Sequence, residues 1–94
     1  MGWGSEKLLK GPNYAMRIRQ IEKEVLWPKV VQHLKYAPGT LDGRAIITLN
    51  KFVPKYAEEM CFQEHGKRSD ADLMASEAKF HALLKATKVA ENAS

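Results

Sequence analysis

The sequence predicts an all-α fold, a small bundle of three to four helices, two of them broken or kinked at Pro28 and Pro54. Apolar residues recur at spacings of three and four over long stretches, and clusters of turn-forming residues separate these stretches. The chain has 94 residues, of which 45% are hydrophobic and 28% charged, which is enough for one modest core. We therefore expect an N-terminal arm over residues 1–13, followed by a single helical domain over residues 14–94.

The first periodic region follows Gly11-Pro12-Asn13 and predicts an amphipathic helix. Its apolar residues are spaced by four, three and four: Tyr14, Ile18, Ile21 and Val25. A second stripe lies on nearly the opposite side of the same helix: Trp27, Val30, Val31 and Leu34. Pro28 cannot donate an intrahelical hydrogen bond and disfavours helical angles at Trp27. We expect a break or sharp kink at Trp27-Pro28, which would turn both short helices toward one core.

Residues 37–43 are rich in turn formers and divide the chain into two halves. The apolar residues after this loop are spaced by three, four, three and four: Ile46, Leu49, Val53, Tyr56 and Met60. This spacing favours a helix that ends near Gly66, kinked at Pro54. The alternative is a short β-strand over residues 44–49, before a helix that begins near Asn50.

Ser69, followed by Asp70 and Asp72, predicts the start of a final helix that continues to about Asn92. Its main apolar face holds Leu73, Phe80, Leu83 and Leu84. A second stripe on the opposite side holds Ala75, Ala78, Ala82, Ala86 and Val89. Two interpretations stay open, a second contact face or alanines that fill solvent positions because alanine is the best helix former.

The single cysteine, Cys61, cannot close an internal disulfide, which indicates a reducing compartment. The N-terminus lacks the apolar run of a secretory signal, and no stretch of about 18 apolar residues predicts a membrane span. We expect an intracellular protein, cytoplasmic or organellar, with mitochondria among the candidates and secretion excluded. Peripheral association with a membrane remains compatible with the sequence.

No pattern in the chain predicts catalysis. Gly-rich phosphate loops are absent from the sequence. Glu58, Cys61 and His65 share one predicted helix face, but three ligands with a single thiolate fall short of a structural zinc site. Cys61 is interpreted as a small packing residue and His65 as a helix C-terminal residue. We expect no catalytic residue, no cofactor and no metal.

Two functions remain. The first is a non-catalytic accessory subunit or adaptor that binds other proteins in a larger assembly, because the apolar stripes exceed the needs of one small core. Its predicted partner contacts are Trp3, Trp27, Ala75, Ala78, Phe80, Ala82, Leu84 and Ala86. Trp3 is included because large aromatics dominate interface energies.

The alternative function is binding of RNA or DNA by the basic N-terminal third. Lys and Arg outnumber Asp and Glu by seven to three in residues 1–35, whereas residues 36–94 hold eight of each kind. This excess of positive charge favours contact with phosphate or with an acidic surface. The predicted contacts are Lys10, Arg17, Arg19 and Lys23.

Overall fold

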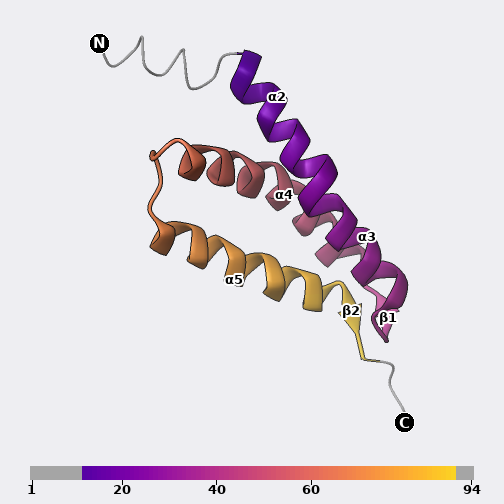
Figure 1. Ribbon diagram of the computed structural model, residues 1–94. Coiled ribbons are helices and arrows are strands. Elements are labelled where there is room, and N and C mark those ends of the chain that lie inside the picture. The colour runs from indigo at the N-terminus through magenta and orange to yellow at the C-terminus, as the bar shows by residue number, and fades with distance from the viewer. Residues whose placement is uncertain (1–11, 91–94) are drawn as a thin grey trace.

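The computed structural model describes residues 12–90, which form a small, mainly helical bundle with one two-stranded sheet (Figure 1). The first helix consists of three segments that follow one another without a gap: α2 (Pro12–Ile21), the π-helical turn η1 (Glu22–Leu26) and α3 (Trp27–Tyr36). The other elements are β1 (Thr40–Leu41), α4 (Gly43–Glu64), α5 (Asp70–Ala86) and β2 (Lys88–Val89). The all-α prediction is confirmed. Of the predicted arm, only Pro12 and Asn13 are described, and they begin α2; residues 1–11 lie outside the described part.

The helix α4 occupies the centre of the bundle. It forms an antiparallel hairpin with α5, and it also packs against α2 and η1, which cross it (Figure 1). Within residues 12–90, no helix combines the length and the apolar character needed to cross a membrane.

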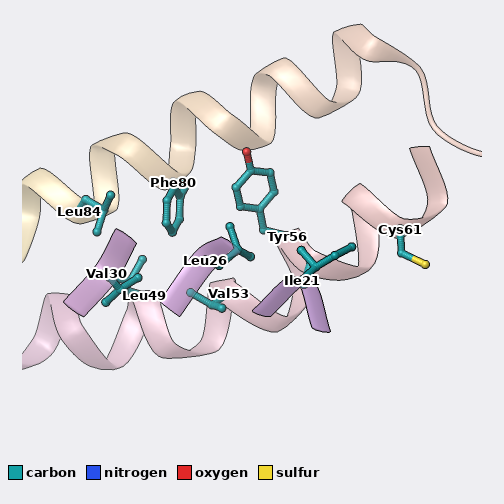
Figure 2. Close-up of a cluster of buried hydrophobic side chains, with 10 residues drawn as sticks. Ile21, Leu26, Val30, Leu49, Val53, Tyr56, Cys61, Phe80 and Leu84 are labelled. Carbon is teal, nitrogen blue, oxygen red and sulfur yellow. The ribbon is translucent and has the colours of Figure 1, made fainter. Parts of the chain in front are cut away.

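The core lies where these helices meet, and Figure 2 shows side chains from all of them converging there. The first helix contributes Ile21, Leu26 and Val30, each at most 2% exposed. The other two helices contribute Leu49, Val53, Tyr56, Ala57, Cys61, Phe80 and Leu84.

Of the break or sharp kink predicted at Trp27-Pro28, the break is wrong. Leu26 (φ −85°, ψ −52°) and Trp27 (φ −61°, ψ −38°) both keep right-handed helical angles, and the helix continues through Pro28. The apolar face is shifted instead by the π turn, in which the Trp27 N–H donates to the carbonyl of Glu22, five residues earlier. Proline has no backbone N–H, and its ring crowds the preceding carbonyls of a helix. The wider turn leaves room for the ring, so proline is tolerated directly after it.

The π turn also explains which apolar residues are buried. One extra residue in a turn moves the following side chains by about 100° around the helix axis. The buried residues Ile21, Leu26 and Val30 are accordingly spaced by five and then four. Val31, which belongs to the second predicted stripe, is 58% exposed.

The helix α4 confirms the helical prediction for its region, and the alternative strand over residues 44–49 is wrong. Asp42 caps its start, because the Asp42 carboxylate accepts from the backbone N–H groups of Arg44 and Ala45. Pro54 lies inside the helix without ending it. At the other end Gly66 (φ +74°) donates to the Gln63 carbonyl and Lys67 to the Phe62 carbonyl. This Schellman arrangement needs the left-handed angle that glycine adopts easily.

The helix α5 begins as predicted, with the Ser69 hydroxyl accepting from the Asp72 N–H at 3.1 Å. It ends at Ala86 rather than near Asn92, because the following residues pair with the loop before α4. Thr40 lies opposite Val89, and Leu41 opposite Lys88, in an antiparallel pair. We call this pair of short strands the clasp.

Gly39 makes the close approach of the clasp possible. It has φ +117°, and a Cβ atom at this position would lie 2.5 Å from the Val89 carbonyl oxygen.

The burial pattern around the π turn predicts opposite effects for two apolar substitutions. Leu26→Ala should lower the free energy of unfolding by about 2 to 5 kcal/mol, because it leaves a cavity in the core. Val31→Ala should change it by less than about 0.5 kcal/mol, because Val31 is exposed. Urea unfolding followed by far-UV circular dichroism measures both changes. A larger loss for Val31→Ala than for Leu26→Ala would contradict the register of the first helix.

Candidate functional site

The residues predicted to contact a partner fall into three groups in the structure. Trp3 lies outside the described residues. Trp27 is partly buried and packs against the core, whereas Phe80 (2% exposed) and Leu84 (7% exposed) belong to the core itself. Phe80 contacts the ring of Tyr56 at a centroid distance of 5.3 Å. These three side chains are therefore occupied by contacts within this chain.

The alanines of α5 are all exposed. Ala75, Ala78, Ala82 and Ala86 recur at spacings of three and four along one exposed side of the helix, and we call this surface the alanine face. It is the part of the predicted partner surface that the fold leaves open.

A groove of about 430 Å³ lies beside the alanine face, between α4 and α5. Its lining is Thr48, Lys51, Phe52, Lys55, Glu59, Ala75, Ser76 and Lys79. Ala75 belongs both to the groove and to the alanine face, so the two form one continuous surface. We call the combined surface the α4–α5 surface.

Three lysines and one glutamate give the groove a positive charge. Lys51 and Lys55 lie one turn apart on α4, and Lys79 approaches from α5. The carboxylate of Glu59 accepts a hydrogen bond of 2.7 Å from the Ser76 hydroxyl, so it already has a partner within the groove. The groove therefore carries three positive charges and one negative charge.

The aromatic ring in the groove has neighbours on two sides. The Lys79 Nζ lies 5.2 Å from the centroid of the Phe52 ring, and Phe52 stacks on Tyr56 at 5.7 Å. Burial raises the pKa of Tyr56, and the carboxylates of Glu77 and Glu59 add to this effect. Because Lys79 and Tyr56 already lie against its ring, Phe52 supplies apolar lining to the groove and is poorly placed to stack on a nucleic-acid base.

Sequence analysis did not identify the basic groove. The spacing of Lys51 and Lys55 shows that they share one side of a helix, but Lys79 is 24 positions after Lys55. Only the packing of α5 against α4 brings the third lysine to the other two.

Three of the four basic residues predicted as contacts in the N-terminal third line a hollow on α2 and the start of η1. Its lining is Asn13, Met16, Arg17, Arg19, Gln20, Lys23 and Glu24. Arg17 is engaged elsewhere, because its guanidinium donates from Nε to Glu64 Oε1 at 2.9 Å and also forms an ion pair with the second carboxylate oxygen. Arg19 and Lys23 are exposed, and Lys10 lies outside the described residues.

The pair of Arg17 and Glu64 joins α2 to the end of α4. The hydrogen bond from Arg17 lowers the pKa of Glu64, and the same contact raises the pKa of Arg17. Both side chains are more than a third exposed, so the pair stabilises the fold only weakly.

Cys61 lies close to this pair but is buried. Burial raises the pKa of its thiol, and the nearby carboxylate of Glu64 acts in the same direction. The thiol is therefore protonated at neutral pH and is a weak nucleophile.

The pair of Arg17 and Glu64 predicts a small, pH-dependent stabilisation. The folded state lowers the pKa of Glu64 below its ordinary value of 4.5, so the contribution is present at neutral pH and is lost as the pH falls through the folded-state pKa. Glu64→Gln should lower the free energy of unfolding by less than about 1 kcal/mol at neutral pH, and by nothing measurable in strong acid. Urea unfolding at the two pH values tests this, with the exposed Glu58→Gln as the control. A loss that persists in acid would contradict the role of the ion pair.

Comparison of the chain with protein-family models, with curated proteins and with solved structures finds no match in any of the three. The surfaces and contacts of residues 12–90 are therefore the basis for proposing a function.

Proposed function

We propose that this protein is a non-catalytic helical accessory subunit or adaptor within a larger protein assembly, and that its α4–α5 surface binds an acidic amphipathic helix of a partner protein. The observation that carries the proposal is the basic groove continued by exposed alanines. Each part of this surface matches one property of such a helix.

The small side chains match the shape of a helix. Alanines on an outer helix face let a second backbone come close, and a groove between two helices is a common seat for an amphipathic helix. Ala75 and Phe52 supply apolar contact, to which the aliphatic stems of the lysines add.

The charges match an acidic partner. Lys51, Lys55 and Lys79 outnumber the single carboxylate that lines the groove, that of Glu59. Glutamates or aspartates along a partner helix would meet these ammonium groups, which speeds encounter and disfavours basic partners.

An experiment with two groove variants tests this proposal. The tagged full chain is treated with a carbodiimide, which joins lysines to carboxylates, in extracts of cells that produce it. We expect one recurrent partner protein, cross-linked through Lys51, Lys55 or Lys79. The double change Lys51→Glu and Lys55→Glu should reduce its recovery by about tenfold or more. Ala78→Glu should also reduce recovery, because it blocks close approach at an exposed position.

The matched control reverses two exposed lysines of α3, Lys29→Glu and Lys35→Glu, and should leave recovery unchanged. Far-UV circular dichroism establishes that all variants remain folded. The proposal is wrong if the cross-links form elsewhere, if the groove variants bind as well as the control, or if the chain remains a monomer without a partner.

Binding of RNA or DNA is the second candidate, and the hollow on α2 is the observation that favours it. Arg19 and Lys23 are its exposed basic groups, while Arg17 is held by Glu64. Glu24 in the same hollow weakens the attraction for phosphate.

Fluorescence anisotropy with labelled single-stranded RNA and duplex DNA tests this candidate. If nucleic acid is the ligand, binding weakens steeply with salt, and Arg19→Ala with Lys23→Ala reduces the salt slope by about two phosphate contacts. Lys85→Ala, on the exposed surface of α5, serves as the control and should leave the slope unchanged. Absence of binding at low salt would reject this function.

A further inference from the structure

The end of α4 brings three different metal-ligating side chains together. Cys61, Glu64 and His65 each offer one ligand atom, and these atoms all lie within 4.8 Å of one another. The spacing of three and four residues places them on one side of the helix end. Cys61 is buried, whereas Glu64 and His65 are exposed. In Figure 2, Cys61 lies at the opposite end of the core cluster from Leu84.

Side chains of α2 already orient two of these three residues. The Tyr14 ring packs on the His65 ring with their centroids 4.6 Å apart. Arg17 donates to the Glu64 carboxylate. Contacts of this kind, made by residues that are not themselves ligands, fix the orientation of metal ligands in many proteins.

The chemistry of the three atoms selects a class of cation. A thiolate sulfur and an imidazole nitrogen bind Zn²⁺ and related transition metals, whereas Mg²⁺ and Ca²⁺ prefer oxygen ligands. Three protein ligands plus water form the usual tetrahedral set of an open zinc site. With metal–ligand bonds of about 2.0 to 2.3 Å the ligand atoms lie roughly 3.5 Å apart. Rotation of the exposed Glu64 and His65 side chains can bring the three ligand atoms from within 4.8 Å of one another to this shorter separation.

We propose that Cys61, Glu64 and His65 bind one divalent transition-metal cation of the Zn²⁺ type at the junction of α2 and α4. This site replaces the combination of Glu58, Cys61 and His65 considered from the sequence, because the fold places Glu64 beside the other two ligands. A carboxylate has about four lone-pair sites, so Glu64 can bind the cation while Arg17 keeps its hydrogen bonds. The Cys61 thiol releases its proton to solvent when the cation binds.

Binding would also strengthen the attachment of the first helix. Two of the ligands contact α2 directly, Glu64 through Arg17 and His65 through Tyr14. Holding these ligands in one geometry therefore holds the Arg17 and Tyr14 contacts as well. Because the unfolded chain does not hold the three ligands together, the cation stabilises the folded state by mass action.

Titration of the full chain with Co²⁺, under a reductant that contains no thiol, tests the site. Co²⁺ takes the place of Zn²⁺ and makes the coordination visible. We expect one equivalent to saturate a thiolate-to-cobalt charge-transfer band, and Zn²⁺ to displace the Co²⁺. Zn²⁺ alone should also raise the melting temperature of the protein. Absence of the charge-transfer band when Co²⁺ is in large excess would overturn the proposal.

Two ligand variants and one control locate the cation. Cys61→Ser should abolish the charge-transfer band. His65→Asn, at an exposed position, should weaken Co²⁺ binding by about 100-fold or more. His81→Asn, which changes an exposed histidine of α5, should leave the affinity unchanged. Equal affinity of His65→Asn and the unmodified chain would place the cation elsewhere and overturn the proposal.

Discussion

The π turn at Glu22–Leu26 is the feature on which the rest of the structure depends. The apolar residues of the first helix do not form one straight stripe, because they change sides along the sequence. By adding one residue to a turn, the chain brings Ile21, Leu26 and Val30 onto one buried side. Without this shift, the end of the helix would turn its apolar side chains to solvent.

Once the first helix covers one side of α4, the hairpin with α5 completes the burial of the central helix. This arrangement uses Phe80 and Leu84 for the core and leaves the opposite side of α5 open. The α4–α5 surface is thus a product of the same packing. The lysines of α4 line the groove because the inner positions of α4 are already taken by residues such as Leu49 and Val53.

Much of the fold was predictable from local signals. The caps at Ser69 and Gly66 depend on hydrogen bonds between near neighbours, and residue types alone indicate them. The continuous helix through Pro28 was not predictable from the sequence. The π turn forms only because burial of Leu26 and Val30 outweighs the local preference of the backbone for a break before proline. The end of α5 was also missed, since the clasp joins residues that are far apart in sequence.

The candidate site also combines features that the sequence predicts with features that depend on contacts between separate helices. Helical periodicity identified the exposed alanines, but it cannot distinguish a side chain that faces its own core from one that faces a partner. Phe80 and Leu84 were assigned to a partner for this reason, and the structure places them inside. Neither the meeting of Lys79 with Lys51 nor that of Glu64 with Arg17 has any local signature, because each joins separate helices.

The clasp has a consequence for the shape of the groove. The hairpin of α4 and α5 is closed at one end by the turn at Gly66 and at the other by the pairing of Thr40 with Val89. Thr87 is fully buried beside that pairing, and its carbonyl accepts from the Asp42 N–H at 2.9 Å. Two helices fastened at both ends cannot splay apart independently. The backbone on both sides of the groove is therefore held in place, so binding of the proposed partner would order little further backbone of this chain.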